Sequence, residues 1–346
     1  MRTVLVVPDR DPAAPSGGDR YDAALVDAWP GAISVHRAAG SWPHPDEADV
    51  RALGEVLERT GAGPVLLDGL VGCAAPEVVG ASAAVRPTVL LVHSTLTAGS
   101  GAQGEEAVAL DASERQALRA AHLVVTTSAW SAADLEGRYG LTGVVVARPG
   151  VDVAPVATGS DRAPQLLVLA ALSPVKNHAV LLAALARLLD RPWSLVVAGP
   201  APDRSFAEEL SGTARRLGLQ ERVTWAGPLA GTELEQVWQR TDLLVHPSRS
   251  ETWGMVVTEA LAHGIPAVVT GGTGAQEALA LHGTERPGAT VRVDDPDAWC
   301  GVLRRWLEDP DTRAAWRSAA LDRRARLPGW DRTARTVADA LAGVAR

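Results

Sequence analysis

The chain has 346 residues, 47% of them hydrophobic, which is enough for two domains of ordinary size. Its net charge of −8 is concentrated in the first 150 residues, where 11 arginines face 18 acidic residues. This balance disfavours nucleic acids and anionic membrane surfaces as partners, since both require a basic surface, and the absence of an apolar run of roughly 18 residues or of a signal peptide leads us to expect a cytoplasmic protein without integral membrane association.

The first half of the chain alternates short apolar runs with segments of helical periodicity. This alternation is typical of a doubly wound, Rossmann-like α/β domain. A first helix is expected just after Gly18, with Tyr21 and Leu25 on its apolar face. Strands are predicted at 3–7, 32–36, 64–68, 88–93, 123–127 and 144–147, and further helices at 46–59, 76–84, 113–120 and 129–139.

A proline- and glycine-rich loop follows the first predicted strand and runs through Gly17 and Gly18. Because glycine has no Cβ, such a loop lets backbone amides approach a phosphate closely. The alternative is a flexible surface turn without a ligand.

His93 ends the predicted strand at 88–93, so it should lie at the carboxyl edge of the sheet, where ligands bind. The alternative is a structural histidine. Residues 94–110 are polar and are predicted to form a long loop that could act as a lid over a ligand. Within them, Gly99, Gly101 and Gly104 match the G-x-G-x-x-G pattern of dinucleotide binders. The pattern is displaced from the strand and followed by two glutamates, which disfavours a pyrophosphate site.

The second half repeats the alternation, with strands predicted at 165–170, 193–198, 222–225, 242–246, 267–269 and 290–293. Ser173 is a possible cap for a helix predicted at 177–189. Lys176 lies between the strand predicted at 165–170 and this helix, and it is the single lysine of the chain. Asp294-Asp295, ahead of Pro296, is typical of a helix cap.

The segment 242–270 predicts a strand, a loop, a helix and a further strand. Glu251 on the loop and Glu259 on the helix are separated by seven residues, which places both near one helix N-terminus. Helix N-termini attract phosphate, and carboxylates accept hydrogen bonds from sugar hydroxyls. This pattern favours a site for a diphosphate with attached sugars.

The sequence EALAHGIP at 259–266, whose Glu259 is separated from Glu251 by seven residues, resembles the signature of the family-four retaining glycosyltransferases of the GT-B fold. The resemblance implies two Rossmann-like domains facing across a cleft, residues 1–150 and 151–329, with a C-terminal helix at 330–346 that crosses back to the first. It also implies that Glu251 contacts the donor sugar, that Glu259 contacts the ribose, and that four backbone positions contact the sugar diphosphate: Trp253, Gly254, Met255 and Val256.

The same resemblance implies that Lys176 binds the donor phosphate, that Gly17 and Gly18 lie against the diphosphate, and that His93 lies near the reacting sugar. One departure stands out, because Ala170-Ala171 replace the Gly-Arg pair that the family usually carries. Arg249 is the nearest candidate for the missing phosphate-binding cation.

We expect no cofactor and no metal, since no strand-associated Asp-x-Asp motif occurs and Cys73 and Cys300 lack metal-ligand spacing. Both cysteines are expected to be buried. The predicted function is metal-independent, retaining transfer of a sugar from a nucleotide donor, with uridine diphosphate favoured, to a small soluble acceptor. The alternatives are a sugar phosphorylase of the same family, a non-catalytic nucleotide-sugar binder and a dinucleotide oxidoreductase. Nothing in the sequence sets the oligomeric state.

Overall fold

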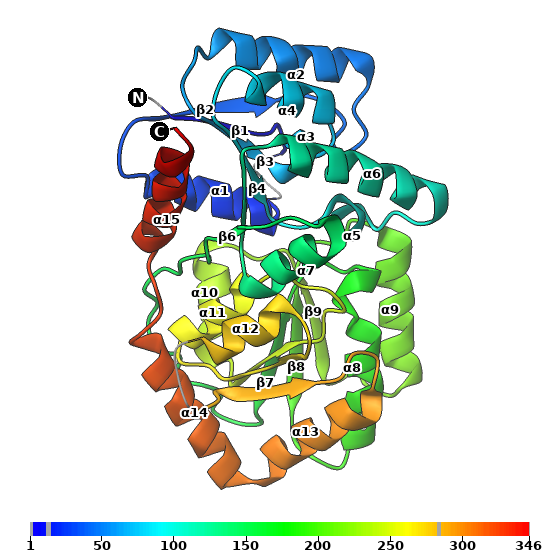
Figure 1. Cartoon of the computed structure of the whole chain (residues 1–346). Helices are drawn as coiled ribbons and strands as arrows, with labels where there is room; N and C mark the ends of the chain where they lie inside the picture. Colours follow the sequence, from blue (N-terminus) through cyan, green and yellow to red (C-terminus); the bar gives the residue numbers. More distant parts are fainter. Residues whose placement is uncertain (1–2, 12–14, 282–284, 346) are drawn as a thin grey trace. The chain divides into compact units, whose positions relative to one another are not determined.

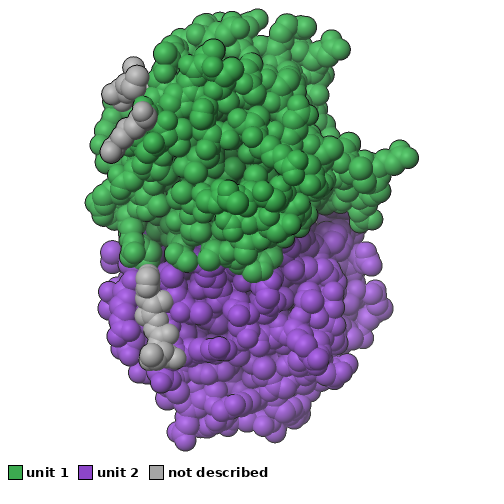
Figure 2. Space-filling view, in the orientation of Figure 1, with its two compact units in different colours: residues 1–150, 328–346 green, residues 151–327 purple. Residues whose placement is uncertain are grey.

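The computed structural model describes residues 3–11, 15–281 and 285–345 of the chain (Figure 1). The chain forms two compact units, which Figure 2 colours separately. Unit 1 comprises residues 1–150 and 328–346, and unit 2 comprises residues 151–327. Arg346, the last residue of the predicted final helix, lies outside the described residues. In the described part of the chain, no helix is both long and apolar enough to span a membrane.

Unit 1 is built on a six-stranded sheet of order β2-β1-β3-β4-β5-β6, in which neighbouring strands are parallel. Helices cover both faces, which explains why the central strands are continuous apolar runs (Figure 1). The strand order reverses between β1 and β3, so ligands are expected beyond the carboxyl ends of these strands. The strands are β1 (Thr3–Pro8), β2 (Ile33–Ala38), β3 (Val65–Asp68), β4 (Thr88–Val92), β5 (Leu123–Thr126) and β6 (Val145–Val146).

In unit 1, helices replace the loop that was predicted as a lid. Residues 94–110 are not a long loop: they form one short helix and the start of a second. Thr95 caps the first of these helices, and Gly101 ends it with φ 74°. A hydroxyl cap and a left-handed glycine thus begin and end the first of the two helices, and the G-x-G-x-x-G pattern lies at helix ends. The helices are α1 (Gly17–Asp27), α2 (Glu47–Arg59), α3 (Gly69–Gly72), α4 (Pro76–Ala83), α5 (Leu96–Ser100), α6 (Gly104–Ala120), α7 (Ala129–Tyr139) and α15 (Trp330–Val344).

The C-terminal helix α15 packs within unit 1. The ring of Trp330 meets the ring of Tyr21 edge to face, with centroids 5.4 Å apart. The Thr333 hydroxyl donates to the Arg148 carbonyl over 2.7 Å. Gly150 makes this approach possible, because a Cβ there would lie 2.4 Å from the Trp330 nitrogen. The end of the chain is therefore part of the same core as β1 to β6.

Unit 2 contains a second six-stranded parallel sheet, of order β12-β11-β10-β7-β8-β9. Its order reverses between β7 and β10, which again places the expected ligand crevice beyond two central strands. Both sheets confirm the predicted α/β class with two doubly wound units. The strands are β7 (Gln165–Leu169), β8 (Ser194–Ala198), β9 (Val223–Gly227), β10 (Leu243–His246), β11 (Ala267–Thr270) and β12 (Gly288–Val291).

The helix after β7 corrects a second prediction. Ser173 is followed by a 3-10 turn, η1 (Pro174–Lys176), and its described side chain makes no capping hydrogen bond. Helix α8 begins only at His178, after Asn177 with φ 55°. The remaining helices of unit 2 are α8 (His178–Leu185), η2 (Ala186–Leu188), α9 (Arg204–Arg216), α10 (Gly231–Arg240), α11 (Met255–Ala262), α12 (Gly274–Ala280), α13 (Pro296–Glu308) and α14 (Pro310–Arg324).

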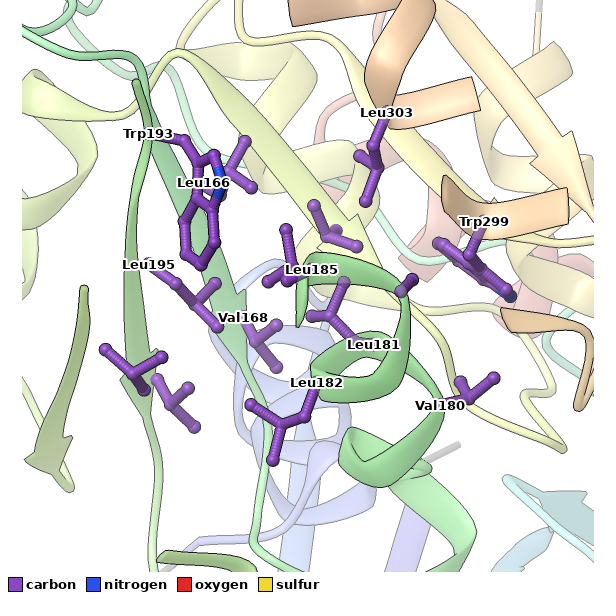
Figure 3. Close-up of a cluster of buried hydrophobic side chains, with 14 of the residues drawn as sticks. Leu166, Val168, Val180, Leu181, Leu182, Leu185, Trp193, Leu195, Trp299 and Leu303 are labelled. Atoms are coloured by element: carbon purple, nitrogen blue, oxygen red, sulfur yellow. The ribbon is translucent and has the colours of Figure 1, made fainter. Parts of the chain in front are cut away.

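One face of the unit 2 sheet is covered by apolar side chains of α8 and α13. Figure 3 shows Leu181 and Leu185 of α8 lying toward Leu166 of β7, with Trp299 of α13 nearby. This cluster packs α8 against the sheet, and α8 follows the turn that carries Lys176. Of the two cysteines expected to be buried, Cys73 is, whereas Cys300 on α13 is only half-buried at the edge of this cluster.

Candidate active site

Three side chains meet where the unit 2 sheet reverses its strand order. Lys176 lies in η1 after β7, His246 ends β10, and Glu251 lies on the loop between β10 and α11. The Lys176 ammonium donates to Oε2 of Glu251 over 2.8 Å, and Nε2 of His246 lies 2.9 Å from the same oxygen. The structure therefore brings together Lys176 and Glu251, which the sequence placed 75 residues apart, and adds His246 to them.

Lys176 and His246 stabilise the ionised form of Glu251. Its side chain is 16% exposed, and that of His246 is 3% exposed. Burial by itself raises the pKa of Glu251, but the Lys176 charge and the hydrogen bond from His246 outweigh burial and lower it far below its ordinary value. At neutral pH, Glu251 is therefore an ionised carboxylate that accepts hydrogen bonds. It can receive hydrogen bonds from sugar hydroxyls but cannot act as a general acid.

Helix α11 presents its N-terminus beside this carboxylate. Gly254 precedes the helix with φ 81°, a conformation that glycine adopts readily, and Met255 and Val256 form its first turn. Trp253 is only 2% exposed and anchors the loop in the core. Glu259 is half-buried on the same helix. The first-turn amides and the helix dipole favour an anion at this end.

Close backbone packing fixes the Glu251 loop. The Gly274 amide donates to the Glu251 carbonyl over 2.7 Å. A Cβ on Gly274 would lie 2.0 Å from the Thr252 carbonyl oxygen, so only glycine fits there. The turn that begins α12 is therefore part of what positions Glu251.

Arg249, the candidate substitute for the missing family arginine, is engaged elsewhere. Its guanidinium pairs with Asp294 over 2.8 Å and donates to the Pro174 carbonyl over 2.7 Å. Its backbone amide donates to the Val175 carbonyl over 2.8 Å. Arg249 thus joins the loop after β10 to the turn after β7, whereas the Lys176 ammonium points to Glu251.

In unit 1, His93 lies just beyond β4 and contacts two buried carboxylates. Its Nε2 is 2.9 Å from Oδ1 of Asp22 on α1 and 3.6 Å from Oδ2 of Asp68, which ends β3. Both aspartates are at least 94% buried. The ligand atoms of the three residues lie within 4.8 Å of one another, close enough for a divalent cation. Because the 2.9 Å contact has the geometry of a hydrogen bond, we interpret the group as an ion pair.

The aspartates set the charge of His93. Burial by itself lowers the pKa of His93, but the charge of Asp22 and its hydrogen bond outweigh burial and raise the pKa to about 9. Burial and the Asp22 charge also raise the pKa of Asp68 well above its usual range. At neutral pH His93 is therefore a cation, which suits a hydrogen-bond donor rather than a general base.

Gly17 and Gly18 do not form the predicted loop. They are the first residues of α1, which Ser16 caps by accepting from the Asp19 amide. The capping box explains the difference, because Ser16 and Asp19 begin the helix before the glycines can form a turn. Gly18 still has a reason to be glycine, since a Cβ there would lie 3.0 Å from the His93 ring.

A groove of about 520 Å³ runs beside α1 over β1 and β2. Leu5, Val7 and Val26 supply apolar lining. Its charged lining residues comprise two arginines and four aspartates, including Asp22. A groove of this size suits a small molecule, and the excess of carboxylates disfavours an anionic one.

Three residues of these clusters were missed by sequence analysis: Asp22, Asp68 and His246. Asp68 and His246 are the last residues of their strands, which is the same signal that selected His93. Asp22 carries no comparable signal, because it lies inside a helix and faces His93 only once α1 is packed on the sheet.

The two doubly wound units, one with a lysine and a paired carboxylate where its strand order reverses, define a two-domain α/β protein. A family model described as "Glycosyl transferases group 1" matches residues 155–323. D-inositol 3-phosphate glycosyltransferase 2 of Catenulispora acidiphila is 31% identical over 301 residues, covering 79% of this chain and 68% of the relative. The chain belongs to this family of glycosyl transferases.

Other relatives are matched over a smaller share of their own length. D-inositol 3-phosphate glycosyltransferase of Kineococcus radiotolerans is 31% identical over 248 residues, covering 64% of this chain and 57% of the relative. Two further relatives of the same description, from Corynebacterium urealyticum and Salinispora tropica, are covered to 55% and 52%. The chain thus matches little more than half the length of these three curated relatives.

Solved structures share the fold over nearly the whole chain. Anabaena HepE, solved in complex with UDP and glucose, has a TM-score of 0.78 at 19% identity and covers 99% of this chain and 100% of its own. Sucrose-phosphate synthase from Thermosynechococcus elongatus has a TM-score of 0.80 at 20% identity and covers 99% of each chain. The prediction of the GT-B fold is confirmed.

Proposed function

We propose that this chain is a retaining glycosyltransferase that moves a sugar from a nucleoside diphosphate donor to a small soluble acceptor without a metal ion. The observation that carries the proposal is the pairing of Lys176 with Glu251 at the switch point of unit 2, beside the N-terminus of α11. A cation and a helix N-terminus can bind a diphosphate, and an ionised carboxylate next to them can bind the hydroxyls of the attached sugar. Unit 2 is then the donor domain.

Each residue has a distinct role in this proposal. Lys176 and the first-turn amides of α11 stabilise the diphosphate as it leaves, which replaces the charge that a metal ion would supply. Glu259 receives the ribose hydroxyls, and Glu251 orients the sugar. His93, as a buried cation of unit 1, donates a hydrogen bond to a substrate hydroxyl. HepE, a fold relative solved with UDP and glucose, supports a UDP-sugar as the first donor to test.

The acceptor is assigned to unit 1. The relatives named above are described as acting on D-inositol 3-phosphate, which supports a polyhydroxylated acceptor. The groove beside α1 carries more carboxylates than guanidinium groups, which supports an uncharged polyol over a phosphorylated one. Inositol and inositol 3-phosphate, compared side by side as acceptors, test this preference.

The assay for the proposed activity compares the configuration of the anomeric carbon in the donor and in the product. We expect transfer from a UDP-sugar to proceed in excess chelator, with a product whose anomeric configuration, read by proton NMR, equals that of the donor. The assay should be run with UDP-, GDP- and ADP-sugars. Activity that disappears with chelator and returns with magnesium, or an inverted product, would contradict the proposal.

A second candidate function is a nucleotide-sugar binder without turnover. Ala170-Ala171 favour it, because the family usually has an arginine at this place for the leaving phosphate. Donor binding measured by thermal shift, with neither transfer nor hydrolysis, would identify this alternative.

A further inference from the structure

Two residues of the described chain that are not glycine have a positive φ, and they bind one another. They are Asn177, with φ 55°, and Asp294, with φ 54°. Nδ2 of Asn177 donates to Oδ1 of Asp294 over 3.0 Å. Left-handed backbone at such residues persists only where surrounding contacts impose it, and it is concentrated at functional sites. This pair lies next to Lys176, which directly precedes Asn177.

Asp294 also holds the other side of the turn that carries Lys176. Its carboxylate pairs with Arg249 over 2.8 Å, and Arg249 in turn donates to the Pro174 carbonyl over 2.7 Å. The turn Pro174–Lys176 is therefore held on both sides of Lys176: Arg249 binds the Pro174 carbonyl before it, and Asn177 follows directly after it. Asp294 binds both Arg249 and Asn177.

We propose that Asp294 is a positioning residue for the Lys176 ammonium. The sequence Asp294-Asp295, ahead of Pro296, predicts a helix cap. The structure gives that task to Asp295, whose side chain accepts from the Ala298 amide at the start of α13. Asp294 is left to clamp the turn at Lys176. Its consequence for donor binding rests on the proposed function, because only a diphosphate at Lys176 would sense the clamp.

A competing role for Asp294 has the opposite sign. If Asp294 held Arg249 away from a bound diphosphate, then removing Asp294 would release a cation and strengthen diphosphate binding. If Asp294 positions Lys176, then removing it weakens diphosphate binding. The side chains of Asp294 and Arg249 are 52% and 45% exposed, so the pair should contribute little to global stability, and unfolding should not obscure the comparison.

The first test observes Lys176 directly. Since Lys176 is the single lysine, protein labelled with ¹³C and ¹⁵N in lysine gives one side-chain Nζ signal, which is the Lys176 signal followed here. Asp294→Gly removes the carboxylate and retains a residue that adopts positive φ. We expect this variant to shift and broaden the Lys176 signal in the absence of any ligand. A signal identical to that of the unmodified protein would overturn the proposal.

The second test measures the affinity for uridine diphosphate by calorimetry. Asp294→Gly should weaken binding about five- to tenfold, and Asp294→Asn, which retains an acceptor oxygen, should recover part of the loss. In a Lys176→Met background, Asp294→Gly should have no further effect, because its action passes through Lys176. Tighter binding by Asp294→Gly, or an equal loss in both backgrounds, would refute the positioning role.

Asp295→Ala provides the matched control. It removes the neighbouring carboxylate and the cap of α13, so it should lower the Tm more than Asp294→Gly does while leaving the Lys176 signal in place. The proposed donor site and the proposed role of Asp294 can be refuted independently. If the unmodified protein binds no nucleoside diphosphate, the donor site is refuted, while a Lys176 signal altered by Asp294→Gly alone still establishes the clamp.

Discussion

Replacing Lys176 by methionine should lower kcat/KM for the best donor about a hundredfold. Methionine keeps an unbranched side chain as far as Cε but removes the ammonium group and its charge. A hydrogen bond to a charged group contributes about 1.5–3 kcal/mol, and the upper part of this range corresponds to a hundredfold change in rate. The effect should be near that upper part, because Ala170-Ala171 supply no second cation and Arg249 is held by Asp294 and Pro174.

Two companion variants make the Lys176 result specific. Lys176→Arg should recover only part of the lost efficiency, because a planar guanidinium does not reproduce the geometry of an ammonium. Arg249→Gln should lose less than Lys176→Met. If instead Lys176→Met loses less than about threefold and Arg249→Gln is nearly inactive, the phosphate-binding role belongs to Arg249.

Replacing His93 by alanine should lower kcat about a hundredfold and leave the affinity for uridine diphosphate unchanged. The proposed hydrogen bond from the His93 cation to a substrate hydroxyl has this effect if that oxygen gains charge in the transition state, since one preorganised donor then contributes on the order of 10² to 10³ in kcat. Diphosphate affinity should not change, because the diphosphate is assigned to unit 2. An unchanged kcat would return His93 to a structural role as the partner of Asp22 and Asp68.

The pH dependence identifies the charged form of His93. Its pKa is raised to about 9 in the folded chain, above the ordinary value of 6.5. Its contribution to stability is therefore complete below 6.5 and is lost as the pH rises through about 9. Activity that needs the cation should fall over the same alkaline limb. Asp22→Asn should move that limb to lower pH, and a profile that does not move would contradict the assigned charge.

Strands and most helices could be predicted because buried parallel strands are uninterrupted apolar runs. Helix α7 was predicted at 129–139, where the structure has it. The supposed lid was misjudged because polar composition predicts a loop, whereas Thr95 and Gly101 supply the local hydrogen bonding and backbone freedom that begin and end a helix. Gly17 and Gly18 were misjudged for the same reason, since the cap at Ser16 decides their conformation.

The sites were predictable only in part. Glu251 and Lys176 could be found because each belongs to a local motif, but their 2.8 Å contact depends on two loops that meet only in the folded sheet. The contact of Asp22 with His93 and the contact of Asp294 with Arg249 could not be predicted, because these partners are 71 and 45 residues away along the chain. Roles that depend on a partner across the sheet require the three-dimensional structure.

The most direct test of the donor site uses the single lysine once more. Protein carrying labelled lysine should be titrated with uridine diphosphate and, separately, with uridine. We expect the one Lys176 signal to shift and saturate with uridine diphosphate, at the affinity that calorimetry gives, and to stay nearly constant with uridine. Saturable binding of uridine diphosphate that leaves the Lys176 signal unmoved would place the diphosphate elsewhere and contradict the proposed site.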